Sequence, residues 1–387
     1  MKFLHTSDWH LGKRLYKLER LDEQSFFLDW LIETLLHEQI DHLLVAGDIF
    51  DVPQPPHRAL KLFYDFIAKL LDQTKTQLWI IGGNHDSASL LDAPASLLDS
   101  KRIHLFGGLK ETPQEHWVKI PYQNSHIDLC LLPYFRQYEL MKWSERVSGE
   151  NESEHLIHQL IHLPTQGVAR FFMGHHLFGF SEAAGSEQAI SLSGMDSIPL
   201  SWFSGFEYVA LGHIHKPQIL SKKTPAAIYS GSPIPMRFSE TKPKSVIIGE
   251  WKGELHYQEK AIPQRRQFLS LSITPSHWRE KILEQKSEWL TLELRLKLQA
   301  PVTGLMDDIR SFCAQEGVEL LNIITEFEQT EIEDQKDHWS ELLDLTPEEL
   351  FEQFYLHKYS QETSVPKDLM DDIKNLWQEA SLAPPLA

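Results

Sequence analysis

The feature that most constrains this chain is a short, mostly apolar run followed at once by a cluster of glycine, aspartate, asparagine or histidine. Runs of this length are typical of buried strands. They occupy residues 3–6, 42–46, 77–81, 170–173 and 207–211, and a further run lies at 127–132. Polar groups that follow the strands of an open α/β sheet meet at its carboxyl edge, where ligands bind. The pattern therefore predicts one site assembled from five distant loops.

The spacing of the apolar residues also indicates the fold class. Between the first three runs, residues 23–37 and 58–71 carry helical periodicity, and this β-α-β-α-β order favours a largely parallel sheet covered by helices. Further runs at 226–230, 246–251 and 255–261 have little helical pattern between them. We expect them to be antiparallel strands that complete a second sheet.

The pattern changes near residue 268. Residues 289–298 alternate leucine with polar residues, which predicts a half-buried strand with one face in water. A helical pattern at 302–315 and a strand pattern at 318–327 follow, so a small α+β domain is expected. The predicted divisions are a main domain at 1–265, a small domain at 268–328, an acidic linker at 329–345 and a helical segment at 346–380.

The C-terminal segment has two interpretations. Residues 346–349 form a capping box with proline at the first helical position, which predicts a helix start. Apolar stripes follow at one-face spacing: Leu350, Phe351, Phe354 and Tyr355, then Leu369, Met370, Ile373, Leu376 and Trp377. These stripes either pack on their own domain or dock on a partner helix.

Charge is distributed unevenly along the chain. The net charge is −18, and residues 271–387 hold 24 acidic against 10 basic residues. The first 270 residues are therefore nearly balanced, and a phosphate backbone is not strongly repelled there. Cys130 and Cys313 are too few for a disulfide framework, and the start of the chain turns polar too early for a signal peptide. We expect a soluble intracellular protein.

The five polar clusters supply oxygen and imidazole donors. The candidate ligands are Asp8, His10, Asp48, Asn84, His175, His213 and His215. A mixed N/O set without thiolates excludes zinc-finger and iron–sulfur sites. Seven ligands are too many for one ion and suit two, with one carboxylate bridging, as in phosphate-displacing enzymes. Each motif alone has an ordinary reading as a turn or a hydrogen-bonded pair, but all five in order behind strands favour the metal site.

These motifs resemble the signature of the calcineurin-like metallophosphoesterases: DWH at 8–10, GD at 47–48, GNHD at 83–86, GH at 174–175 and GHIH at 212–215. The flanking segments SDWHLG, AGDIFD, YVALGHIH and YSGSP are similar to the double-strand-break repair nucleases of that family. The resemblance covers roughly residues 1–260 and continues more loosely to 328. It implies an α/β fold with a two-sheet β-sandwich flanked by helices, a small capping domain and a C-terminal helical tail.

The resemblance also implies roles for individual residues. One metal would be held by Asp8, His10 and His215, and the other by Asn84, His175 and His213, with Asp48 bridging. His85 would stabilise the transition state or protonate the leaving oxygen, with Asp86 orienting its ring. Manganese is the ion expected. Two positions stay open: Asp51 stands where archaeal relatives have histidine, and His176 is the alternative to His175.

The implied activity is a metal-dependent DNA nuclease, a 3′→5′ exonuclease on duplex ends and an endonuclease on single strands and hairpins. It would act in DNA repair, recombination and replication, in the bacterial cytoplasm with the nucleoid. A coiled-coil ATPase would be its partner, docked on the tail, and the nuclease would be a homodimer within a heterotetramer. The alternative is a phosphodiesterase or phosphatase for small molecules or proteins with the same two-metal site. A non-catalytic scaffold should have lost ligands, and none is missing.

Overall fold

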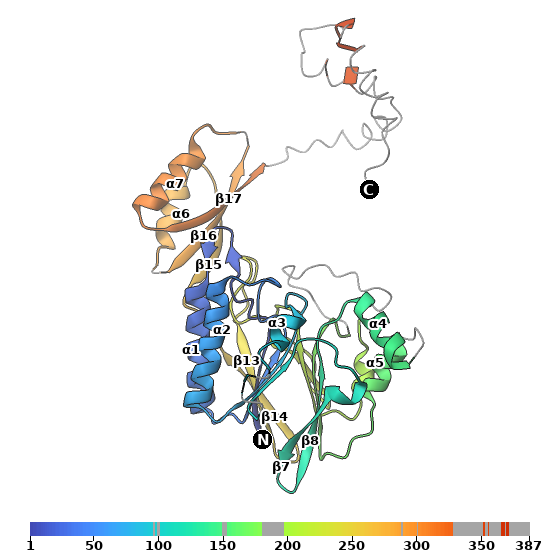
Figure 1. Cartoon of the computed structure of the whole chain (residues 1–387). Helices are drawn as coiled ribbons and strands as arrows, with labels where there is room; N and C mark the ends of the chain where they lie inside the picture. Colours follow the sequence, from blue (N-terminus) through green and yellow to red (C-terminus); the bar gives the residue numbers. More distant parts are fainter. Residues whose placement is uncertain are drawn as a thin grey trace. The chain divides into compact units, whose positions relative to one another are not determined.

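The computed structural model describes residues 1–95, 97–98, 101–148, 153–179, 197–287, 289–299 and 301–327, with a few positions between 351 and 370 (Figure 1). Two compact units are present, and nearly all described residues belong to the first, which comprises Met1–Lys297 and Val302–Thr325. In the second unit, Phe351 and Tyr355 are helical and their rings lie 6.2 Å apart. The predicted acidic linker and most of the predicted helical segment lie outside the described residues.

Two six-stranded sheets form the larger part of the first unit. The first sheet has the order β14 (Leu255–Ala261), β13 (Ser245–Trp251), β1 (Lys2–Thr6), β4 (His42–Ala46), β5 (Gln77–Ile81) and β6 (Ile103–Phe106). The second has the order β11 (Gln218–Ser221), β12 (Ala226–Tyr229), β10 (Tyr208–Gly212), β9 (Arg170–His175), β8 (Ser125–Leu132) and β7 (Trp117–Tyr122). Strands β1, β4, β5 and β6 are parallel, as are β8, β9, β10 and β12. The two-sheet prediction is confirmed.

The expected pairing of the later strands is wrong in two respects. Strand β12 is parallel to β10, not antiparallel. Strands β13 and β14 are antiparallel, but they extend the first sheet: β13 pairs with β1, and Leu4 lies opposite Ile248. Strand β13 is buried along nearly its whole length, so it belongs in a sheet interior. The edge of β1 that does not pair with β4 provides such an interior position.

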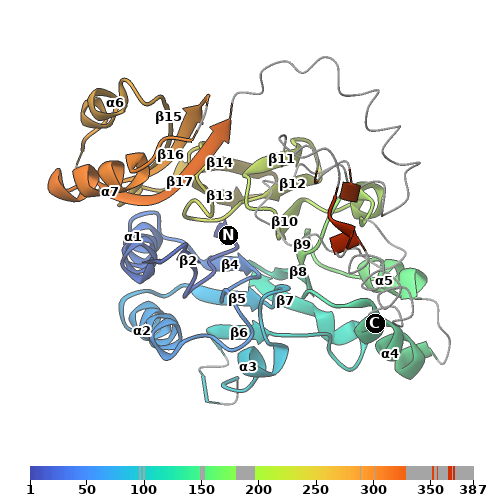
Figure 2. The same ribbon diagram turned by 90° about the horizontal axis from the view of Figure 1, so that it is seen from above.

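Three hydrophobic clusters hold the layers together. One lies between the two sheets and includes Phe3, Phe171 and Tyr208. A second lies between the first sheet and helices α1 (Leu21–His37) and α2 (His57–Gln73), and the third packs α4 (Gln137–Ser148) and α5 (Ser153–Ile161) on the second sheet (Figure 2). No helix among the described residues is both long and apolar enough to span a membrane.

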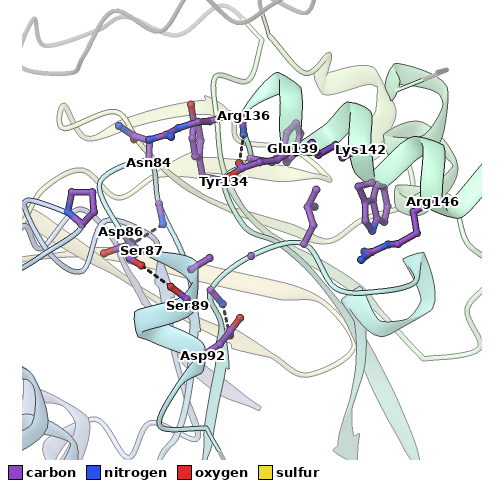
Figure 3. Close-up of a pocket in the computed structure, with 18 residues that line it drawn as sticks. Asn84, Asp86, Ser87, Ser89, Asp92, Tyr134, Arg136, Glu139, Lys142 and Arg146 are labelled. Carbon is purple, nitrogen blue, oxygen red and sulfur yellow. Dashed lines mark hydrogen bonds between the residues drawn. The ribbon is translucent and has the colours of Figure 1, made fainter.

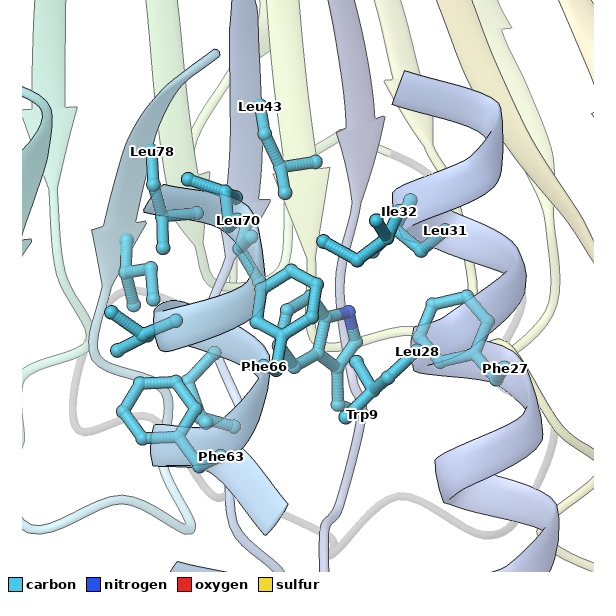
Figure 4. Close-up of a cluster of buried hydrophobic side chains, with 14 of the residues drawn as sticks. Trp9, Phe27, Leu28, Leu31, Ile32, Leu43, Phe63, Phe66, Leu70 and Leu78 are labelled. Atoms are coloured by element: carbon cyan, nitrogen blue, oxygen red, sulfur yellow. The ribbon is translucent and has the colours of Figure 1, made fainter. Parts of the chain in front are cut away.

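Trp9 connects the helical layer to the predicted site. Its side chain is fully buried, and its ring meets Phe27 of α1 and Phe66 of α2 edge-on at 5.9 and 5.3 Å (Figure 4). Its neighbours along the chain are Asp8 and His10. Packing of this indole therefore anchors the loop that carries the first two predicted ligands.

A third sheet follows in the order β15 (Gln267–Ile273), β16 (Leu290–Leu298) and β17 (Glu319–Phe327), with helices α6 (Trp278–Glu284) and α7 (Leu305–Gln315). The predicted water-facing side of β16 is wrong at its start, where Thr291 and Glu293 are buried. Tyr16, from the turn between β2 (Arg14–Leu15) and β3 (Leu18–Glu19), donates its hydroxyl to Glu293 at 2.9 Å. These polar side chains face the main part of the protein, not solvent.

Candidate metal centre

The predicted ligands come together at the carboxyl ends of the parallel strands of both sheets. Asp8 follows β1, Asp48 follows β4, and His213 follows β10. Backbone hydrogen bonds tie the first two loops: the amide of Asp8 donates to Gly47 O and that of His10 to Asp48 O, both at 3.0 Å. The amide of His213 donates to the Asp8 carboxylate at 3.0 Å, which joins the two sheets at this edge.

Several of the predicted ligands have backbone conformations that L-residues seldom adopt. The φ angles of Asp8, His10, Asp48 and His213 are +54°, +46°, +53° and +99°. Such conformations cost free energy and persist where the surrounding structure enforces them, commonly at functional sites. The hydrogen bonds between the loops provide that enforcement here, so the ligands are held in position by the fold itself.

The first group of donors surrounds His10. Its Nε2 lies 3.0 Å from His215 Nε2 and 3.5 Å from Asp48 Oδ2. Donor atoms of Asp8, His10, Asp48 and His215 all lie within 4.8 Å of one another, and all four residues are buried. The structure therefore brings these four predicted ligands together.

The second group surrounds Asn84, whose Oδ1 lies 3.1 Å from His175 Nε2 and 3.0 Å from His213 Nδ1. His175 Nε2 is also 3.4 Å from Asp48 Oδ2. Its other ring nitrogen, Nδ1, donates to Ala46 O at 2.7 Å, which fixes Nε2 as the atom that faces the site. Asp48 borders both groups and lies where a bridging carboxylate is expected.

These distances fit divalent metal ions. Two donor atoms bound to one ion at about 2.1 Å lie about 3.0 Å apart at octahedral angles and about 3.4 Å apart at tetrahedral angles. The donor pairs in both groups are 3.0–3.5 Å apart. Unprotonated imidazole nitrogens and carboxylate oxygens that converge at this spacing repel one another unless a cation lies among them.

Burial shapes the ionisation of these groups. Burial raises the pKa of Asp8 to about 6. It also works against the charged forms of His175 and Asp48, but their mutual attraction raises the pKa of His175 to about 9 and holds that of Asp48 well below its usual range. The charge of Asp48 is therefore balanced by a protonated histidine when no metal is bound, and a divalent ion would take over that balance.

The adjacent histidines His175 and His176 are clearly distinguished. His176 lies outside the donor groups, with Nε2 3.3 Å from Pro133 O and its ring stacked on Tyr134 at 5.2 Å. Burial lowers the pKa of His176 to about 3, so it is a neutral core residue. His175 is the residue that faces Asn84 and Asp48.

The predicted partner of His85 requires correction. The Nδ1 of His85 bonds to the backbone carbonyl of Asp51 at 2.7 Å. Both carboxylate oxygens of Asp86 instead accept backbone amides, from Ile49 and Gly83 at 3.1 and 2.9 Å and from Phe50 at 2.9 Å. Asp86 therefore joins the 48–51 loop to the 83–86 loop and does not orient the His85 ring.

The structure gives a supporting role to Asp51, which the sequence interpretation left open, and to Lys244, which it missed. The Asp51 carboxylate lies 3.3 Å from His10 Nδ1 and 2.8 Å from Lys13 Nζ, a position from which it orients His10. Lys244 is buried and donates to His215 O at 3.1 Å and to Glu240 at 2.6 Å. Asp51 stands three residues after Asp48, which is a usable signal, whereas nothing in the sequence marks Lys244.

Fold, donor groups and sequence together define the class of protein. Residues 1–217 match the calcineurin-like phosphoesterases, and residues 266–359 match the type 5 capsule protein repressor C-terminal domain. The chain belongs to the calcineurin-like phosphoesterase family.

Within that family, several similar proteins are nuclease subunits. The chain is 30% identical to the SbcD subunit of the nuclease SbcCD from Escherichia coli K12 over 76% of this chain and 78% of that protein. It is 31% identical to the corresponding Bacillus subtilis protein over 76% and 79%, and 34% identical to that of Rhodobacter capsulatus over 62% and 64%. A solved structure of a dimetal phosphatase from Danio rerio aligns with 68% of this chain and 96% of its own, at 12% identity and a TM-score of 0.40.

Proposed function

We propose that this chain is a metal-dependent DNA nuclease, the SbcD-type component of a complex with an SbcC-type ATPase. The observation that carries the proposal is a complete set of seven donor residues in a chain that is about 30% identical to named nuclease subunits over most of its length. The first 270 residues have a nearly balanced charge, which supports an arrangement in which the ATPase partner provides much of the DNA binding.

The finer proposals follow the resemblance. The activities are 3′→5′ exonuclease on duplex ends and endonuclease on single strands and hairpins, with Mn²⁺ as the ion. The assembly is a nuclease homodimer within a heterotetramer, and the segment 346–380 docks on the ATPase. Residues 1–265 are the nuclease domain, 268–328 the capping domain and 329–345 the linker. The setting is DNA repair, recombination and replication in the bacterial cytoplasm.

We assign the ligands by the two donor groups. Asp8, His10 and His215 hold one ion, Asn84, His175 and His213 hold the other, and Asp48 lies between them. Two such ions activate water and stabilise the charge that develops on a phosphodiester. The remaining residues have supporting roles: Asp51 orients His10, and Asp86 fixes the spacing of two loops.

His85 is the proposed acid. Its Nδ1 is held by Asp51 O, so Nε2 is the nitrogen available to the substrate. The His85 ring lies 4.7 Å from the His10 ring, next to the first donor group. Burial lowers the pKa of His85, which favours release of its proton. A protonated His85 donates to the leaving oxygen of the scissile phosphodiester and returns to the neutral form.

Cleavage of labelled DNA tests the proposal. Purified protein is incubated with end-labelled duplex and hairpin DNA and Mn²⁺, with and without EDTA and with and without the SbcC-type partner and ATP. We expect cleavage that EDTA abolishes, that the partner extends, and that His85→Ala lowers by about 10²–10⁴-fold. His256→Ala, a change at an exposed histidine, is the matched control and should cleave normally.

If the chain is instead a phosphodiesterase or phosphatase for small molecules or proteins, it uses the same residues, but the cleavage experiment gives a different result. DNA would stay intact with the partner present while bis(p-nitrophenyl) phosphate is hydrolysed in a His85-dependent way. That outcome would keep the metal centre and reject the nuclease.

A further inference from the structure

A polar pocket opens directly beside the metal centre. Its volume is about 710 Å³, and Gly83 and Asn84 form part of its wall. Asn84 also contributes the oxygen that faces His175 and His213. The pocket therefore begins at the second donor group and is continuous with it.

Helix α4 and the residue that precedes it, Arg136, contribute three basic side chains to the pocket wall. Figure 3 shows Asn84, Asp86 and the Arg136 side chain toward one end of the pocket and Arg146 at the other, with Lys142 between them. Lys142 and Arg146 are four residues apart in α4, so they share a face of that helix. At a rise of about 1.5 Å per residue, the ten residues from 136 to 146 span about 15 Å.

The acidic side chains of the pocket are already engaged within the protein. Asp92 accepts from Gly107 N at 2.8 Å and lies 3.3 Å from Lys110 Nζ, and the Glu139 carboxylate accepts from Arg136 N at 2.7 Å. Asp86 is occupied by backbone amides. By contrast, Arg136 and Lys142 are exposed and form no ion pair with any carboxylate of the described residues.

An aromatic ring lies at the metal end of the pocket. Tyr134 is half-buried, and one face of its ring covers His176 at 5.2 Å. Aromatic rings beside a row of cations are the usual features of single-strand binding grooves, because bases stack on the rings and phosphates follow the cations. A pocket of this volume suits a ligand of small-molecule dimensions, which matches a few nucleotides of one strand and not a duplex.

We infer that this pocket binds the single strand on one side of the scissile phosphodiester, with Arg136, Lys142 and Arg146 contacting its phosphates. The inference rests on the proposed nuclease function and specifies its substrate path. Successive phosphates of a stacked strand advance about 3.4 Å along the strand axis, so a basic wall about 15 Å long spans about four nucleotides. Phosphate contacts of this kind position a strand without reading its sequence.

Binding and cleavage by one variant test the inference. The full-length protein with Arg136→Gln, Lys142→Gln and Arg146→Gln is compared with wild type and with a matched control, Lys222→Gln, Lys223→Gln and Lys252→Gln. Lys222 and Lys223 precede β12, and Lys252 follows β13, so these cations lie at the ends of the strands away from the metal centre. Affinity for a fluorescent 15-mer of thymidylate is measured by anisotropy in EDTA over a range of salt concentrations.

We expect the pocket variant to bind the 15-mer about 10- to 100-fold more weakly, with a salt dependence reduced by about 2 in log–log slope. The control variant should lose much less affinity for the 15-mer. Hydrolysis of bis(p-nitrophenyl) phosphate with Mn²⁺ should be unchanged in the control variant, and the pocket variant should keep the wild-type affinity for Mn²⁺ because the donor groups are intact.

Several results would overturn the inference. Affinity and salt slope equal to those of wild type, or a loss no larger than that of the control, would show that the strand runs elsewhere. Because Arg146 also donates to Lys110 O at 3.4 Å, the double variant Arg136→Gln and Lys142→Gln separates strand binding from local folding. If wild type binds the 15-mer through this pocket but never cleaves DNA, the proposed nuclease function fails while the pocket assignment stands.

Discussion

Two glycines determine how closely the metal-binding loops approach each other. A Cβ on Gly83 would overlap the amide nitrogen and a carboxylate oxygen of Asp48, and a Cβ on Gly47 would overlap the His175 ring. Gly47 also has a φ of +87°, which glycine adopts at little cost. The small residues beside the ligands are therefore part of the site geometry.

Gly83→Ala tests this requirement. The added methyl group must displace Asp48, so we expect the affinity for Mn²⁺ to fall by about 10–100-fold, as when a supporting contact of a metal ligand is lost. Isothermal titration calorimetry measures the affinity. Gly205→Ala is the control: its methyl group meets nothing within 4 Å, and its positive φ costs stability without touching the metal centre. Equal affinities in the two variants would contradict the steric explanation.

At this scale the sequence predicted which residues gather at the carboxyl edge of the sheets better than it predicted the residues that support them. Asp8, Asp48 and His213 could be predicted because each lies two positions beyond the end of an apolar run. Asp86 could not be placed correctly, because its neighbour His85 in sequence is not its neighbour in hydrogen bonding. Partners contributed by other loops depend on how the loops fold against one another.

At the scale of elements, the packing of α1 and α2 supports the first metal-binding loop. Phe66 of α2 is 2% exposed and contacts Trp9, the residue between Asp8 and His10. Strands β4 and β5 begin and end at the predicted residues because their apolar runs are sharply bounded. The position of β13 could not be predicted, since a buried apolar strand fits either sheet equally well.

Phe66→Ala should lower the free energy of unfolding by about 3–5 kcal/mol, because it removes a buried ring and leaves a cavity. Leu36→Ala on α1, where the side chain is 47% exposed, should cost no more than about 0.5 kcal/mol. Urea unfolding of the metal-free proteins measures both. A small loss at Phe66 would mean that the helices move inward to fill the space.

At the scale of the whole molecule, buried neutral histidines link stability to pH. Burial lowers the pKa of His5 to about 3 and those of His42 and His116 to about 4. Each is neutral in the folded protein and binds a proton on unfolding below pH 6.5. Their contribution to stability is complete above that pH and is lost as the pH falls toward about 4.

Urea unfolding between pH 7 and pH 4 measures this effect. We expect the free energy of unfolding to fall by up to about 1.4 kcal/mol per pH unit for each such histidine. His116→Gln should make the decline shallower, since one proton fewer is taken up, whereas the exposed His256→Gln should leave the slope unchanged. Identical slopes in all three proteins would show that His116 does not contribute.

The pairing of β1 with β13 also bears on synthesis at the ribosome. Strand β1 is made before the other strands of its sheet, yet one of its two neighbours appears about 240 residues later. At a translation rate of 5–20 residues per second, this edge of β1 stays unpaired for about 12–48 seconds. During that interval the nascent chain exposes an apolar strand edge of the kind that chaperones and other chains bind. His213 and His215 emerge before β13, so the metal ligands are all present while the sheet that carries Asp8 is still open.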